Sequence, residues 1–271
     1  MTWKAALPMY NVSARIRAGY AALLEALLDQ AGATESCGLI ERVPDAALPA
    51  PLLDFWQRPD LLLSQTCGYP WFYTLRDKAA LVATPCFDLP GCDGSDYSSV
   101  LVVRADRGIH ALEDARGRVA VANERHSNSG MNALRHAVAP LARDGRFFGD
   151  VKWSGSHAAS LRMVRKGTAD LAAIDCVTYA YLQQEKPASV EGLVSLGYTA
   201  ASPGLPLIAG KAVPDVVVRR LRNALLEPEA PLRKTMAALR ITRFARCDEQ
   251  HYLRIARLEE EAIGLGYPEL N

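Results

Sequence analysis

The chain carries a short polar stretch between the apolar run 119–122 and a helix-period segment that begins at Met131. This stretch consists of Ser127, Asn128, Ser129 and Gly130. Serine and asparagine are preferred where a helix begins, because the first backbone N–H groups of a helix have no partner within it. Those N–H groups and the hydroxyls beside them can all face one small anion. The stretch is therefore either an anion-binding loop or an ordinary helix cap.

Neutral hydrogen-bond donors also follow most of the other apolar runs, and few lysines or arginines stand at these positions. In open parallel sheets, ligands bind beyond the carboxyl ends of the strands. Preorganised neutral donors in such a place can hold an oxyanion. The candidate ligand-binding residues beside those of the polar stretch are Tyr10, Gln65, Thr66, Tyr97, His157 and Asp175.

Two of these candidates also have a purely structural interpretation. His157 follows Ser156 where a helix is expected to begin, so it is either an anion ligand or a structural histidine. Asp175 ends the apolar run 171–174 and precedes a helix expected from Val177. It therefore either caps that helix or accepts an ammonium group or a protonated hydroxyl of a ligand.

Strand-like apolar runs alternate with helix-period segments along the whole chain, a pattern typical of parallel α/β proteins. A chain of 271 residues fits one large domain or two lobes. We expect residues 1–96 to form the first part of lobe one and residues 97–198 to form lobe two. Residues 199–271 are then the return crossing and the C-terminal helices, packed on lobe one. Each lobe is expected to hold a mostly parallel sheet flanked by helices.

Three of the predicted helices matter most for the fold and the polar stretch. The segment 13–30 places Ile16, Tyr20, Leu23, Leu24 and Leu27 on one face, as in an amphipathic helix. The segment 46–58 has a helical pattern interrupted by prolines. The segment 130–142 continues the polar stretch as a helix.

The charge balance excludes whole classes of partner. With 31 basic and 30 acidic side chains the net charge is +1, so no overall field attracts nucleic acid or an anionic membrane. No apolar run reaches the roughly 18 residues of a membrane-spanning helix. The first residues lack the pattern of a signal peptide, so the protein is either periplasmic with its signal removed or cytoplasmic. We expect a monomer.

The six cysteines are scattered without a CxxC pair, so neither a zinc site nor any other metal or cofactor is expected. Cys86 and Cys92 flank a loop and either close a small disulfide in an oxidising compartment or remain free thiols. Cys67 is either a buried apolar residue or a nucleophile with His126 or His157 as its base.

Residues 97–138 and 153–182 contain a series of motifs in a specific order. They begin with a Tyr-x-Ser strand and a basic-Ala-Asp turn and continue with the Ser-Gly loop at 129–130. Gly-Ser-His at 155–157 and an Ala-Asp-x-Ala-Ala-x-Asp run at 169–175 follow. This order resembles the periplasmic phosphate-, phosphite- and phosphonate-binding proteins of ABC importers.

The resemblance implies a type II periplasmic-binding-protein fold that closes on its ligand by a hinge motion. The phosphoryl-binding loop of the family then falls on residues 127–129, its cleft tyrosine on Tyr97, its anion-contacting histidine on His157 and its acidic residue on Asp175. The family usually has Ser-Thr-Ser in the loop, so at Asn128 an amide replaces one hydroxyl donor.

Together these features predict a binding protein, not an enzyme, that holds phosphate, phosphite or a phosphonate between its lobes and docks on an ABC permease. Lobe one would contribute Tyr10, Gln65 and Thr66. Two alternatives stay open. The chain is an enzyme on the same fold that acts on a small cofactor precursor, or it is a cytosolic domain that senses the ligand.

Overall fold

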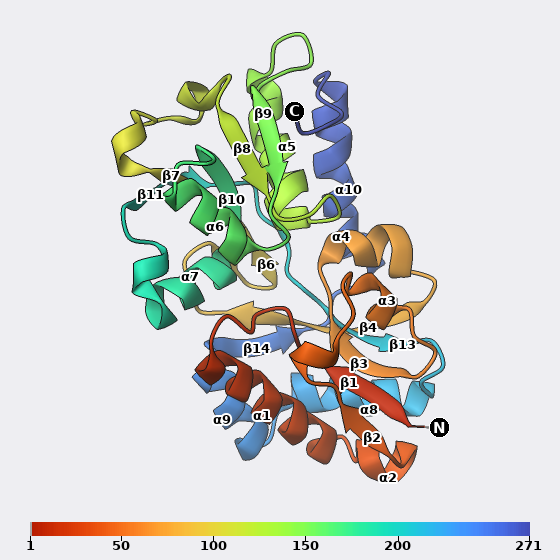
Figure 1. Cartoon of the computed structure of the whole chain (residues 1–271). Helices are drawn as coiled ribbons and strands as arrows, with labels where there is room; N and C mark the ends of the chain where they lie inside the picture. Colours follow the sequence, from red (N-terminus) through yellow and green to blue (C-terminus); the bar gives the residue numbers. More distant parts are fainter. Residues whose placement is uncertain (1) are drawn as a thin grey trace. The chain divides into compact units, whose positions relative to one another are not determined.

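The computed structural model describes residues 2–271, which divide into two compact units (Figure 1). Unit 1 contains the chain up to Asp88, then Asp93–Ser95 and Gly204–Tyr252. Unit 2 contains Leu89–Cys92, Asp96–Pro203 and Leu253–Asn271. Each unit is therefore assembled from segments that lie far apart in the sequence. The expected two-lobed α/β fold is confirmed.

Unit 1 is built on a six-stranded sheet with the order β14-β4-β13-β3-β1-β2. Strand β1 pairs in parallel with β2 and β3, whereas β13 and β14 pair antiparallel with their neighbours. The sheet is therefore mixed, where the sequence predicted a mostly parallel one. Its strands are β1 (Trp3–Ala6), β2 (Ile40–Arg42), β3 (Leu61–Gln65), β4 (Ala79–Phe87), β13 (Leu207–Gly210) and β14 (Ile241–Ala245).

Helix α1 (Ala14–Gln30) confirms the first predicted helix. It begins at Ser13, whose hydroxyl accepts a hydrogen bond from the Ile16 N–H at 3.1 Å. The apolar face predicted for this helix is buried. In Figure 1 helix α1 lies near α8 (Asp215–Leu226) and α9 (Ala230–Ala238) of the same unit. The other helices of this unit are α2 (Ala33–Cys37), α3 (Leu53–Trp56), α4 (Gly68–Pro70), α8 (Asp215–Leu226) and α9 (Ala230–Ala238).

The helix predicted over 46–58 is not continuous. The segment forms a single 3-10 turn, Asp45–Ala47, and the short α3. Pro49 and Pro51 stand between them, and a proline supplies no N–H for a helix interior. The prolines therefore separate the 3-10 turn from α3, in place of one interrupted helix.

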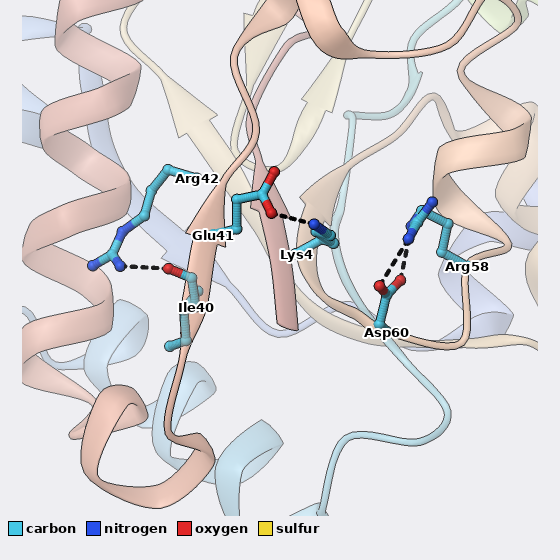
Figure 2. Close-up of polar contacts among 6 residues, drawn as sticks. All are labelled: Lys4, Ile40, Glu41, Arg42, Arg58 and Asp60. Carbon is cyan, nitrogen blue, oxygen red and sulfur yellow. Dashed lines mark hydrogen bonds and ion pairs between the residues drawn. The ribbon is translucent and has the colours of Figure 1, made fainter. Parts of the chain in front are cut away.

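Two ion pairs lie at strands β1 and β2 and just before β3 (Figure 2). Lys4 of β1 pairs with Glu41 of β2. Arg58 donates two hydrogen bonds to the Asp60 carboxylate, at 2.7 and 2.8 Å, and this contact lowers the pKa of Asp60. Because β2 is an edge strand, its charged residues also disfavour pairing with another chain.

Unit 2 is built on a five-stranded sheet with the order β11-β7-β10-β8-β9, also mixed. Its strands are β7 (Ser99–Arg104), β8 (Val119–Ala122), β9 (Asp150–Trp153), β10 (Leu171–Asp175) and β11 (Leu193–Tyr198). A separate three-stranded sheet has the order β12-β6-β5, made of β5 (Cys92–Asp93), β6 (Asp96–Tyr97) and β12 (Ser202–Pro203), and it pairs Tyr97 with Ser202. The helices of unit 2 are α5 (Ala133–Val138), α6 (His157–Arg165), α7 (Cys176–Glu185) and α10 (Glu249–Gly264), whose first four residues belong to unit 1.

The last helix differs from its expected place. We expected all C-terminal helices on lobe one, but most of α10 belongs to unit 2, beside α5 (Figure 1). A buried arginine of α5 connects this helix to α10 and to the segment that follows α10. Arg135 is 4% exposed and donates to the Asn132 side-chain oxygen at 2.7 Å and to the Pro268 carbonyl at 2.8 Å. It also forms an ion pair with Glu259 at 3.0 Å.

This contact makes Arg135→Ala a strongly destabilising change. Removing the guanidinium leaves Glu259 as a largely buried carboxylate without its cation, which should lower the free energy of unfolding by about 3 to 5 kcal/mol. Urea denaturation followed by circular dichroism measures the change. The control is Arg17→Ala, because Arg17 pairs with Asp45 at the surface and should cost about 1 kcal/mol or less. Equal effects of the two variants would contradict the anchoring role of Arg135.

Candidate functional site

The polar stretch forms the start of a helix in unit 2. Ser127 is the cap, and its hydroxyl accepts a hydrogen bond from the Gly130 N–H at 3.0 Å. Residues 128–132 form one π-helical turn that continues directly into α5. The Asn132 N–H reaches back to the Ser127 carbonyl at 3.1 Å, so the turn is wider than an α-helical one. Ser127 is therefore a helix cap, as one of the two interpretations predicted, because its hydroxyl oxygen accepts a hydrogen bond. Its O–H hydrogen can still be donated to another group.

Gly130 is required by a close approach within this turn. A Cβ atom at this position would lie 1.8 Å from the Asn123 side-chain oxygen, a distance that no real contact allows. Asn123 follows β8 directly, so the side chain at the end of the strand lies against the backbone of the helix start. The Asn123 oxygen is buried and has no hydrogen-bond partner among residues 2–271.

Asn128 is fully buried, and its side chain is used within the protein. The amide nitrogen donates to the Ser202 hydroxyl at 2.7 Å and to the Tyr97 hydroxyl at 3.3 Å. The amide oxygen accepts from the Asn132 side chain at 3.0 Å. Both amide hydrogens and the oxygen thus have partners. The side chain of Asn128 therefore positions the loop, and its part in ligand binding stays a prediction.

Ser129 and His157 come together although 28 residues separate them. The Ser129 hydroxyl lies 2.9 Å from His157 Nε2, and the Ser129 carbonyl accepts from the Ser99 hydroxyl at 2.9 Å. His157 is the first residue of α6, whose cap is Ser156. Its other ring nitrogen, Nδ1, is buried without a partner in the described chain.

Ser129 and neutral His157 together carry two hydrogens that can be donated, and the hydrogen bond between them uses only one. A neutral imidazole carries one N–H and the serine one O–H, and a single hydrogen lies between Oγ and Nε2. If Nε2–H donates, the Ser129 O–H is left over; if Ser129 donates, the Nδ1–H is left over. Either tautomer therefore leaves one hydrogen without an acceptor in this contact, either the Ser129 O–H or the buried Nδ1–H.

Burial keeps His157 neutral. Desolvation lowers the pKa of its imidazole to about 4, because the charged form loses hydration that no nearby acidic group replaces. The residue as a whole is only partly buried, but Nδ1 is shut off from solvent. In the unliganded protein the ring is therefore uncharged at neutral pH.

The remaining candidates of unit 2 have different surroundings. Tyr97 is 3% exposed, and its hydroxyl accepts from Asn128. Asp175 caps α7, since its carboxylate accepts from the Thr178 N–H at 2.9 Å. Its structural interpretation is thus supported, and a ligand contact stays a prediction.

The three candidates of unit 1 are all buried. Tyr10 packs against Tyr20 and Phe87, with ring centroids 6.1 and 5.7 Å apart. Thr66 donates its hydroxyl hydrogen to the Cys67 carbonyl at 3.2 Å. Gln65 donates to the Leu205 carbonyl at 3.2 Å, and its amide oxygen is buried without a partner among the described residues. Their part in ligand binding stays a prediction.

Sequence reasoning missed three hydroxyl residues that hold the loop and its neighbouring strand. Ser202 accepts from Asn128, Ser99 donates to the Ser129 carbonyl, and Thr199 accepts from the Ser99 N–H at 2.9 Å. Two of them lie in the segment 199–204, at the start of the expected return crossing. Its small and hydroxyl residues were the available signal, but such residues are common in loops.

Residues 2–271 contain no group of three or more His, Cys, Asp or Glu side chains placed to hold a metal ion. Within the same range, no helix has the length and apolar character needed to cross a lipid bilayer.

Two mixed α/β units with helices on their sheets define the periplasmic substrate-binding proteins of type II as the class to which this fold belongs. A profile described as "ABC transporter, phosphonate, periplasmic substrate-binding protein" matches residues 66–252. The chain therefore belongs to the phosphonate-binding family of ABC-transporter substrate-binding proteins, as the motif order predicted.

Solved structures agree on the fold. The binding-protein component of an ABC phosphonate transporter from Pseudomonas aeruginosa is 18% identical, with a TM-score of 0.79 over 97% of this chain and 87% of that one. A Prochlorococcus marinus protein solved with methylphosphonate is 14% identical, with a TM-score of 0.77 over 96% and 97%. The aliphatic sulphonate binding protein of Escherichia coli is 14% identical, with a TM-score of 0.54 over 97% and 85%. No curated protein matches the sequence.

The buried histidine predicts a specific pH dependence of stability. The unfolded chain takes up a proton on His157 near pH 6.5, but the folded protein takes it up only near pH 4. The free energy of unfolding should therefore fall as the pH drops below 6.5, by up to about 2 kcal/mol at pH 5. Denaturant unfolding at pH 7 and pH 5 measures this, and His157→Gln should remove that part of the loss.

The matched control is His110→Gln, because His110 is exposed. It should keep the full pH dependence of the parent protein. If His157→Gln and the parent lost the same stability between pH 7 and pH 5, the folded state would not hold this imidazole neutral.

Proposed function

We propose that the protein binds a small oxyanion, a phosphonate, phosphite or phosphate, at the loop 127–130 of unit 2 and supplies it to an ABC importer. The family to which the chain belongs consists of binding proteins that serve ABC transporters, so a small ligand and a transporter partner follow from membership. The choice of a phosphorus oxyanion rests on this chain's own residues.

The surplus donor of Ser129 and His157 is the observation that carries the proposal. Among residues 2–271 the Ser129 N–H has no acceptor, since the turn begins at the preceding residue. The Ser127 hydroxyl and the Ser129–His157 pair lie at this helix start and at the start of α6. Several preorganised donors with no acceptor suit a ligand that only accepts, as an ionised phosphonate or phosphate does.

The alternative of an enzyme draws on the same serine and histidine. A contact of 2.9 Å between a hydroxyl and an imidazole is also the geometry of an activated nucleophile. Such a histidine is normally oriented by a third group at its other nitrogen, and Nδ1 of His157 has no partner in the described chain. We therefore favour binding without chemistry, in the periplasm where proteins of this family act.

A comparison of two capping serines tests the site. Ser127 and Ser13 each accept from the N–H three residues on, at 3.0 and 3.1 Å, so either change to alanine should cost about 1 kcal/mol of stability. Only Ser127→Ala should also weaken binding, by about 1 to 3 kcal/mol, because a charged ligand loses a donor. Isothermal titration with methylphosphonate, phosphite and phosphate measures the affinity.

The ligand itself is identified first by a thermal-shift screen of the purified chain. The panel contains phosphate, phosphite, methylphosphonate, 2-aminoethylphosphonate, sulfate and taurine. A ligand at 100 times its Kd stabilises the folded state by about 2.7 kcal/mol, which raises Tm by several degrees. Stabilisation by none of the phosphorus compounds, or equal affinities of the Ser127→Ala and Ser13→Ala variants, would contradict the proposed site. Phosphorus NMR of the recovered ligand detects any turnover and so tests the enzyme alternative.

A further inference from the structure

Two cysteines of unit 2 lie in contact although 84 positions separate them in the sequence. Their sulfur atoms, Cys92 Sγ and Cys176 Sγ, are 3.4 Å apart. Cys92 is the first residue of β5 (Cys92–Asp93), and Cys176 is the first residue of α7. Cys86, which the sequence suggested as a partner for Cys92, lies on β4 of unit 1, where it pairs with Arg243 of β14.

The backbone around these two residues holds them together. The Ser98 N–H donates to the Gly91 carbonyl at 2.8 Å, and the Cys176 N–H donates to the Ser98 carbonyl at 3.2 Å. The backbone of Ser98 thus connects the segment that contains Cys92 to the segment that contains Cys176. The contact between the sulfurs therefore follows from main-chain pairing and does not depend on the side-chain rotamers alone.

Gly91 makes this approach possible. Its φ is +87°, and a Cβ atom there would lie 2.9 Å from the Cys176 Cβ and 2.6 Å from a ring carbon of Tyr198. Any residue with a side chain would push the loop away from α7. Only glycine combines the positive φ with the close approach.

The two thiols differ in access. Cys92 is partly exposed, whereas Cys176 is buried. The contact with Cys92, burial and the neighbouring Asp175 carboxylate all raise the pKa of the Cys176 thiol. A reagent from solution therefore meets Cys92 first.

We propose that Cys92 and Cys176 form a disulfide bond by exchange with a small-molecule or protein disulfide. The Cys92 thiolate attacks one sulfur of the oxidant, whose other sulfur leaves as a thiol. Cys176 then loses its proton and displaces the attached sulfur, which leaves as the second thiol. Two thiols of the protein are oxidised and one disulfide of the oxidant is reduced. The sulfurs must move from 3.4 Å to about 2.05 Å, within the reach of small side-chain rotations.

This proposal is independent of the oxyanion site, because it rests on different residues and a different chemistry. The bond would attach β5 to the first turn of α7 within unit 2. It also gives the chain a chemical feature suited to an oxidising compartment, where such a bond persists.

The test is mass spectrometry of the full chain after incubation with oxidised glutathione. Remaining thiols are alkylated, and the protein is digested without reduction by a protease that cleaves before aspartate. This cleavage places each of the three cysteines in its own peptide, 77–87, 88–92 and 175–214. We expect peptides 88–92 and 175–214 to be linked, two hydrogens lighter than the sum of the two thiol peptides. Reduction should separate them.

Matched variants exclude other links. Cys92→Ser, at the partly exposed position, should abolish the link, whereas Cys86→Ser should leave it unchanged. Oxidation should raise Tm by on the order of 5 °C in the parent protein and in Cys86→Ser, but not in Cys92→Ser. A link between peptides 77–87 and 88–92, or recovery of both Cys92 and Cys176 as alkylated thiols, would overturn the proposal.

Discussion

The amide of Asn128 has no contact with water, so each of its hydrogen-bonding groups must find a partner inside the protein. It finds them on three different elements: Tyr97 on β6, Ser202 on β12 and Asn132 one turn further along its own helix. Asn132 in turn contacts Arg135 and the Ile255 carbonyl of α10. The conformation of the loop therefore depends on a continuous chain of buried polar contacts. Removing one of these side chains leaves its partners without hydrogen bonds in the protein interior, which lowers the stability of the folded state.

Such a network gives the loop rigidity without charge. The hydroxyls of Ser127 and Ser129 and the imidazole of His157 are held by partners that are themselves fixed, so little reorganisation is needed when a ligand arrives. A lysine would attract an anion more strongly from a distance, but it would also attract any anion. Oriented neutral donors respond instead to the number and direction of acceptor atoms, which is a basis for distinguishing tetrahedral oxyanions from other anions.

Local features of this chain were readable from its sequence. The cap at Ser13 and the apolar period behind it predicted α1, and the order of strands and helices predicted a two-lobed α/β fold. The loop 127–130 was recognisable because caps and glycines are local signals. The expected mostly parallel sheets were not found, because β13 and β14 return to their sheet antiparallel after the chain has left unit 1.

Features that depend on distant residues were not readable. The contact of Ser129 with His157, the assignment of α10 to unit 2 and the contact of Cys92 with Cys176 each join segments with no shared pattern. β14 was missed as well, because Ile241–Ala245 is short and carries Thr242 and Arg243 at its exposed positions. The expected bounds of the lobes follow chain order, whereas the units follow packing. Arg135 is buried where the last helix packs, and a sequence does not show which arginine will be buried.

The position of α10 also affects how the molecule can be made. The first segment of unit 2 begins at Leu89, and its last segment is Leu253–Asn271. The last segment of unit 1 is Gly204–Tyr252. While the chain leaves the ribosome, neither unit can reach its full set of contacts, and Arg135 has to wait for its counter-charge until almost the last residue has been added. Each unit can therefore be completed only late in synthesis, after the segment that closes it has been made.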